Sequence, residues 1–222
     1  IEKKTPRNVP NTKGQLAVIG IDYADIRDFA SAGVLTKTDQ GEYVWEQHTW
    51  VCAQSPFFKD IKFPLKNQGQ EEYEDFTIVD TPVIPIEEIV KWCERRMMEY
   101  QVVKIALDTY RYTLFENIFK MHGISIESRD DPDGLVRLIR KIGSATGIIA
   151  PFMEALFAEG HMIYGQSAIM RWFTNNTMTT TDKFGNKTFG KIEPKLRKND
   201  GFMALMVAMF CKDLIEEVVI YV

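Results

Sequence analysis

Three aspartates occupy positions at which carboxylates commonly do chemistry. Asp22 ends an apolar run that begins at Leu16, Asp108 ends a second apolar run, and Asp200 begins the last apolar segment. Carboxylates packed close together repel one another, and Mg²⁺ or Mn²⁺ prefers hard oxygen ligands that leave positions for water. If the fold brings the three aspartates together, the sequence predicts a divalent metal site and metal-dependent phosphodiester chemistry.

Each aspartate also has a purely structural interpretation. Asp200 or Asn199 would cap the last helix, and Asp108 or Thr109 would cap the helix that begins at Tyr110. Asp25 and Asp28 are explained equally well by a solvated loop or as additional ligands. Only their joint placement separates a metal site from a set of caps.

The composition gives no overall sign of a nucleic-acid-binding protein. The 222 residues carry 27 basic and 31 acidic side chains, a formal net charge of -4. A chain of this length commonly forms one α/β domain. Any nucleic-acid surface must therefore be local.

The cysteines, the histidines and the hydropathy argue against several other classes of protein. Cys52, Cys93 and Cys211 are odd in number and widely separated, which argues against a disulfide framework and favours a reducing cytoplasm. The three histidines show no ligand spacing. No stretch approaches the roughly 20 apolar residues of a membrane span, so we expect a soluble protein.

The hydrophobic periodicity predicts a change from antiparallel to parallel strands. Strands are expected over residues 16–24, 28–38 and 43–53, then an irregular segment over 55–75, a helix over 85–98, and a strand–helix–strand unit over 102–107, 110–122 and 124–127. Helices over 144–159 and 168–175, a hairpin over 178–192 and a buried helix over 200–216 follow.

This order of elements resembles the ribonuclease H-like fold, an α/β fold with a mixed sheet flanked by helices, here with an added β-hairpin. In that fold the first strand is central and the fourth lies beside it. The ends that carry Asp22 and Asp108 would then be neighbours, and a helix that begins at the same place would supply Asp200.

Several blocks resemble the C-terminal nuclease domain of the large terminase subunit of tailed bacteriophages. Gly20-Ile-Asp22 followed by Asp28-Phe-Ala-Ser resembles the first acidic motif, and Leu107-Asp108 resembles the second. The third region is matched by Ile163-Tyr-Gly, by Met170-Arg-Trp-Phe-Thr-Asn175-Asn176, and most specifically by Lys198-Asn-Asp200-Gly-Phe-Met-Ala-Leu. The likeness covers about residues 16–212. Tyr23-Ala-Asp25 departs from the small uncharged residues usual in the family, which leaves open whether Asp25 is an extra ligand.

The resemblance implies a metal-dependent endonuclease that cuts double-stranded viral DNA concatemers when genome packaging begins and ends. Two Mg²⁺ or Mn²⁺ ions about 3.5–4 Å apart would activate water and hold the leaving oxygen. Asp22, on the central strand, would bridge the ions, with Asp108 and Asp200 as outer ligands.

The resemblance also implies partners. They are double-stranded DNA, a packaging ATPase domain of the same full-length chain, the portal and the small terminase subunit, with no membrane. The place of action would be the host cytoplasm, transiently at the procapsid portal. The sequence contains no Gly-x-x-x-x-Gly-Lys-Ser/Thr phosphate loop, so residues 15–222 would be the nuclease domain and residues 1–14 a linker from the ATPase domain.

The clearest local concentration of charge lies in one basic segment. Residues 181–198 carry six basic and two acidic side chains, a net charge of +4. We expect Lys183, Lys187, Lys191 and Lys198 to follow DNA phosphates without reading bases. Lysines on a hairpin also prevent edge-to-edge strand pairing, which is the structural alternative.

Two other functions stay open. A junction-resolving nuclease or transposase of the same superfamily would share the metal site, although the block from Arg171 to Asn176 and the lysine hairpin favour the terminase. A non-catalytic module that docks on DNA or the portal would bind DNA without cutting it.

Overall fold

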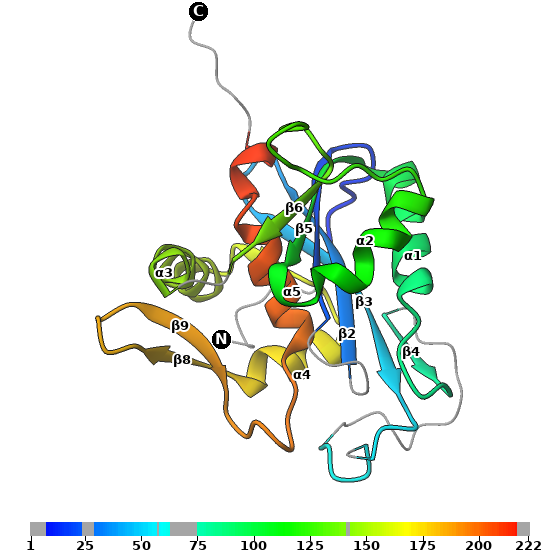
Figure 1. The fold of residues 1–222 in the computed structure, drawn as a ribbon. Coiled ribbons are helices and arrows are strands. Elements are labelled where there is room, and N and C mark those ends of the chain that lie inside the picture. The colour runs from blue at the N-terminus through cyan, green and yellow to red at the C-terminus, as the bar shows by residue number, and fades with distance from the viewer. Residues whose placement is uncertain (1–7, 24–28, 57, 63–74, 141–142, 217–222) are drawn as a thin grey trace, which may run out of the picture.

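Seven strands form one mixed sheet with helices on both faces, and two further strands form a separate hairpin (Figure 1). The computed structural model describes residues 8–23, 29–56, 58–62, 75–140 and 143–216. The expected ribonuclease H-like α/β fold with an added hairpin is confirmed. Among the described helices, none is both long and apolar enough to cross a membrane.

The first three strands form the predicted antiparallel meander. β1 (Leu16–Asp22) pairs with β2 (Phe29–Lys37), and β2 pairs with β3 (Tyr43–Cys52). The turn before β3 contains Gly41 at φ 83°, a backbone conformation that favours glycine. All three strands are almost completely buried, because helices cover both faces of the sheet.

The sheet then continues with parallel strands on the other side of β1. β5 (Gln101–Asp108) lies beside β1, and β6 (Val136–Ile139) lies beside β5. The order β4-β3-β2-β1-β5-β6 makes β1 central, as the resemblance implies. α1 (Ile86–Glu99), a 3₁₀ turn (Thr109–Arg111) and α2 (Tyr112–Met121) belong to the crossovers, with α1 and α2 on one face (Figure 1).

Two short strands have no clear signal in the sequence. β4 (Phe76–Val79) pairs in parallel with the end of β3, and β7 (Met162–Ile163) pairs with its beginning. Four and two residues are too few for an alternating pattern to stand out from the surrounding loop.

The strand predicted over 124–127 is wrong. This described segment forms only an isolated bridge, between Ile126 and Val136, and β6 takes the place beside β5. Ser125 and Glu127 are polar, whereas Val136 and Ile139 are buried against the sheet, so the later segment gains more by filling this edge.

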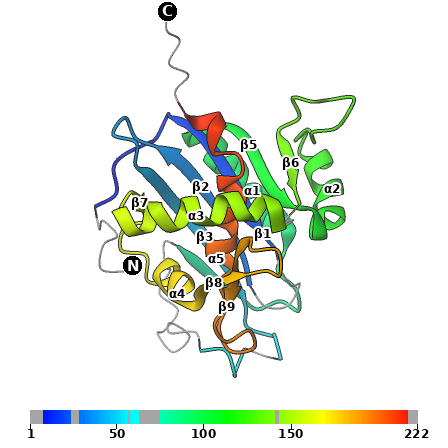
Figure 2. The same ribbon diagram turned by 90° about the vertical axis from the view of Figure 1, so that its left-hand side faces the viewer.

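Helices from the C-terminal part of the chain cover the opposite face of the sheet. α5 (Asp200–Met209) lies against β1 and β2, and α3 (Gly143–Glu159) crosses outside it (Figure 2). α4 (Ala168–Asn176) leads into the hairpin, β8 (Thr177–Thr181) and β9 (Lys187–Lys191). α5 is almost wholly apolar because it lies between the sheet and α3.

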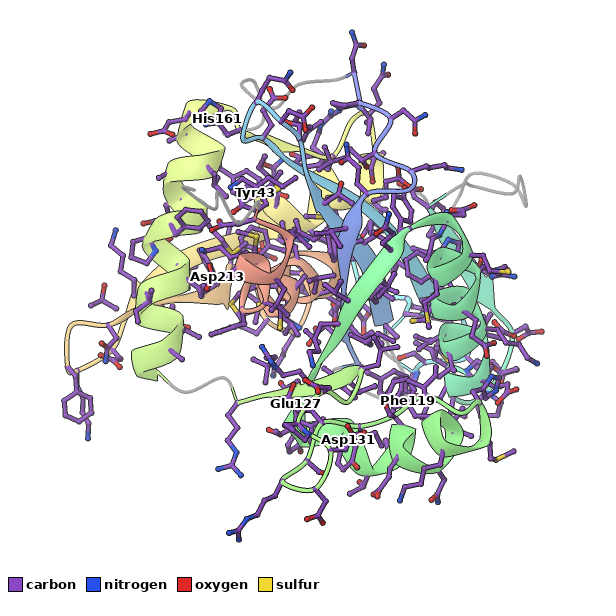
Figure 3. The ribbon with its side chains drawn as sticks, turned by 90° about the horizontal axis from the view of Figure 1, so that it is seen from above. Tyr43, Phe119, Glu127, Asp131, His161 and Asp213 are labelled. Atoms are coloured by element: carbon purple, nitrogen blue, oxygen red, sulfur yellow. The ribbon has the colours of Figure 1, made fainter. Side chains whose placement is uncertain are left out.

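The sequence predicts a last helix that reaches residue 216, but the helix ends at Met209. The N–H groups of Phe210 and Cys211 donate to carbonyls three residues back, and a 3₁₀ turn (Lys212–Ile215) follows. The chain then reaches Glu216, which accepts a hydrogen bond from the Tyr43 hydroxyl at 2.6 Å. Tyr43 lies between α3 and the sheet (Figure 3), whereas the Asp213 side chain is exposed.

Candidate active site

Asp22 and Asp108 end neighbouring parallel strands at the same edge of the sheet. Ile21 of β1 is in register with Leu107 of β5, and each aspartate is the next residue. Side chains alternate along a strand, so both aspartates share the face of Gly20 and Ala106, which α5 covers. The predicted adjacency of these two strand ends is confirmed.

Asp108 also acts as a cap, which is the structural role that the sequence allows for it. Its Oδ1 accepts a hydrogen bond from the N–H of Tyr110 at 3.1 Å, at the start of the 3₁₀ turn. This bond fixes the carboxylate at the strand end. A cap that uses one oxygen is compatible with a ligand role for the same side chain.

α5 reaches this region because β1 has a glycine where the two cross. A Cβ on Gly20 would lie 2.2 Å from the carbonyl oxygen of Ala204 and 2.8 Å from the Cβ of Ala208. The close approach sets the helix directly on the strand two residues before Asp22. Asp200 lies one helical turn before Ala204, in the first turn of α5.

Two of the three carboxylates are strongly buried. Asp22 is 4% exposed and Asp200 is 2% exposed. Asn199, the N-cap of α5, makes no side-chain capping bond, and the buried Oδ2 of Asp200 accepts no hydrogen bond from the described part of the chain. A buried carboxylate oxygen without a donor is costly, and a cation would remove that cost.

The three aspartates do not form a complete metal-binding cluster in the structure. Within the described residues, no group of three or more His, Cys, Asp or Glu side chains is placed to hold a metal ion. Asp25 and Asp28, the candidates for additional ligands, lie outside the described residues. The metal role of Asp22, Asp108 and Asp200 stays a prediction.

Asn176 holds the segment that leads to Asp200. It is completely buried at the end of α4, donates to the carbonyl oxygen of Lys198 at 2.7 Å, and accepts from the Arg197 guanidinium at 3.2 Å. Asn176 ends one of the blocks that resemble the terminase family, but the block by itself implies no role for it. Gln47, a buried polar side chain of β3, has no distinguishing signal in the sequence, because it stands among the consecutive polar residues Glu46, His48 and Thr49.

The lysines of the basic hairpin differ in their surroundings. Lys187 is paired with Glu154 of α3 at 2.7 Å, whereas Lys183 is exposed and lies 4.9 Å from the centre of the Phe184 ring. Lys191 and Lys198 are half-buried. The DNA role of all four lysines stays a prediction.

Comparison with solved structures identifies the fold. The large terminase of bacteriophage HK97 superposes with a TM-score of 0.75 at 14% identity, over 92% of this chain and 41% of that chain. The large terminase nuclease from thermophilic phage G20c superposes with a TM-score of 0.57 at 11% identity, over 92% of this chain and 90% of that one. The chain has the fold of a phage large terminase nuclease domain.

Two G20c structures bear on the chemistry of the terminase nuclease fold. One contains bound magnesium (TM-score 0.56, 12% identity) and another bound cobalt (TM-score 0.51, 11% identity). This chain spans about two fifths of the HK97 large terminase. No protein-family model and no curated protein matches the sequence.

Proposed function

We propose that this chain is the nuclease part of a phage large terminase, a metal-dependent endonuclease that cuts double-stranded viral DNA concatemers when packaging begins and ends. The observation that carries the proposal is the set of three aspartates on β1, β5 and α5. Two end adjacent strands and the third begins the helix that crosses them. The terminase nuclease fold and the metal-bound G20c structures support it.

Carboxylate oxygens are the hard ligands that Mg²⁺ or Mn²⁺ prefers. Asp22, Asp108 and Asp200 would hold the ions, with Asp22 on the central strand as the bridging ligand. When bound, two such ions supply an activated water and neutralise charge on the leaving oxygen. The chain would contribute a buried carboxylate at the end of β1 from Asp22, a carboxylate at Asp108 that caps the next turn, and a carboxylate at a helix N-terminus from Asp200.

The partners follow from the same proposal. The exposed part of the hairpin would contact duplex DNA through phosphates, without reading sequence. A packaging ATPase domain would precede the nuclease in the full-length chain, with residues 1–14 as the linker. The portal and the small terminase subunit would bring the enzyme to the procapsid in the host cytoplasm.

Cleavage of supercoiled plasmid tests the proposal. The protein is incubated with Mn²⁺, with Mg²⁺ or with chelator, and nicked and linear products are measured. We expect cleavage with metal and none with chelator. Asp22→Ala, Asp108→Ala and Asp200→Ala should each abolish cleavage while circular dichroism shows a folded protein, and full activity in one variant would remove that residue from the site.

The alternatives give different results in the same assay. A junction-resolving nuclease would prefer four-way junctions to linear duplex. A non-catalytic docking module would bind DNA but leave the plasmid intact with every metal.

A further inference from the structure

We propose that Gln47 is a positioning residue of the metal site, whose side-chain amide anchors the hydrated cation held by Asp200. This inference rests on the proposed function. It adds a neutral group from β3, a strand to which no ligand has been assigned, and explains why a polar side chain is buried there.

Gln47 lies beneath the first turn of α5. β1, β2 and β3 place Gly20, Gly33 and Gln47 in one row across the sheet, on the face that α5 covers. A Cβ on Gly201 would lie 2.2 Å from Oε1 of Gln47 and 2.5 Å from the Phe173 ring. Glycine at this position therefore lets the helix rest directly on the Gln47 amide, next to Asp200.

The amide of Gln47 is buried without a partner. The residue is 8% exposed, and neither its Oε1 nor its Nε2 has a hydrogen-bond partner among the described residues. An unpaired buried amide is destabilising, so native proteins rarely keep one without a ligand, an ion or a water.

Other unpaired polar atoms belong to the same turn. Oδ1 of Asn199 and Oδ2 of Asp200 are also buried and unpartnered in the described chain. Together with the Gln47 amide they offer three acceptors and one donor site around the first turn of α5. A bound Mg²⁺ ion keeps several water molecules, and these waters donate hydrogen bonds to nearby oxygen atoms. A hydrated divalent cation would therefore satisfy the carboxylate and the other oxygen acceptors at this turn.

Metal affinity, measured without turnover, tests the proposal. Mn²⁺ is titrated calorimetrically into the metal-free parent, Gln47→Leu and Gln47→Glu. We expect Gln47→Leu to weaken Mn²⁺ binding by about tenfold, as losing a group that orients a metal ligand does. Its metal-free melting temperature should not fall below that of the parent, because the substitution removes unpaired polar atoms. Gln47→Glu should restore binding to at least the parent value.

A matched control separates this role from general packing. Thr36 of β2 is also buried and polar, but its hydroxyl donates to Thr12, so Thr36→Val should leave Mn²⁺ affinity unchanged. If Gln47→Leu does not fold, Gln47→Met preserves the shape and is titrated instead.

Two outcomes overturn the proposal and are distinguishable. In the first outcome the parent binds Mn²⁺ and cuts plasmid, and Gln47→Leu binds Mn²⁺ as tightly as the parent. Gln47 would then be a packing residue, and the proposed nuclease function would stand. A parent that neither binds Mn²⁺ nor cuts plasmid would overturn both.

Discussion

Asn176 donates its side-chain amide to the carbonyl oxygen of Lys198 at 2.7 Å, two residues before Asp200. The end of α4 is thereby attached to the beginning of α5. The block from Arg171 to Asn176 and the block from Lys198 to Asp200 are separate in sequence, but this bond makes them one structural unit. The occurrence of both blocks in one chain therefore has a physical reason.

Asn176→Ala should disturb both stability and cleavage. The variant removes the hydrogen bonds of Asn176 with the Lys198 carbonyl and the Arg197 guanidinium, at an expected cost of about 1–3 kcal/mol of unfolding free energy. Urea denaturation and plasmid cleavage measure the two effects. Asn117→Ala, on the exposed face of α2, is the control, and equal effects of the two variants would contradict the assigned role.

Asp200→Asn should raise metal-free stability and remove metal-dependent stabilisation. The carboxylate oxygen is buried and unpartnered in the described chain, so a neutral amide should gain about 1 kcal/mol without metal. Saturating Mn²⁺ at about 100 times Kd would stabilise the parent by about 2.7 kcal/mol. Thermal melting with and without Mn²⁺ measures both, and a variant that melts lower than the parent yet still gains from Mn²⁺ would make Asp200 a structural residue.

Gly20→Ala should be among the most damaging conservative substitutions. Its Cβ would lie 2.2 Å from a helix carbonyl oxygen, which cannot rotate away, so we expect a loss of about 3 kcal/mol. Gly190→Ala, where the nearest atom is 3.4 Å away, should be tolerated. Comparable melting temperatures for the two variants would mean that α5 does not need its close approach to β1.

His122 should make stability depend on pH through the contact between α1 and α2. Its Nδ1 lies 2.8 Å from Glu94 and its Nε2 lies 3.1 Å from Glu87, and these carboxylates, Glu94 first, raise the histidine pKa. A raised pKa means that the folded state holds the proton more tightly. The contribution is complete below the unfolded pKa of about 6.5 and is lost as pH rises through the folded value.

Urea denaturation between pH 5.5 and 9 measures this dependence, in steps of about half a pH unit around the histidine pKa. His122→Gln should be less stable than the parent at the acidic end, and the difference should shrink toward the alkaline end. Glu94→Gln should reduce the pH trend, while Glu88→Gln, exposed on the same helix, should not. A difference that is constant over pH would show that His122 contributes only packing.

The hairpin lysines should differ in their effect on DNA binding. Lys183→Gln should reduce the slope of log K against log salt by up to about 0.9 for its lost phosphate contact. Lys187→Gln should change the slope less, because Glu154 already pairs with this lysine, and Glu154→Gln should strengthen binding. Fluorescence anisotropy with duplex DNA measures the slopes, and identical slopes for all variants would favour the edge-protection role.

The sequence by itself determined the elements with strong local patterns. The meander, the helices around 86–99 and 143–159 and the hairpin follow from periodicity and from Gly at turns, since those signals act within a few residues. The central place of β1, with the next parallel strand beside it, was expected from the resemblance to the ribonuclease H-like fold and is found in the structure. The order of elements along the chain permits the adjacency of Asp22 and Asp108, and the pairing of β1 with β5 in the structure shows it.

Only the tertiary structure decided which side chains complete the site region. β6 formed at Val136–Ile139 instead of 124–127 because burial against β5 outweighed local propensity. Gln47, Asn176 and Gly20 lie against residues that are distant in the chain, and Lys187 forms an ion pair with Glu154. Such roles depend on long-range packing, which no pattern within a short window of sequence contains.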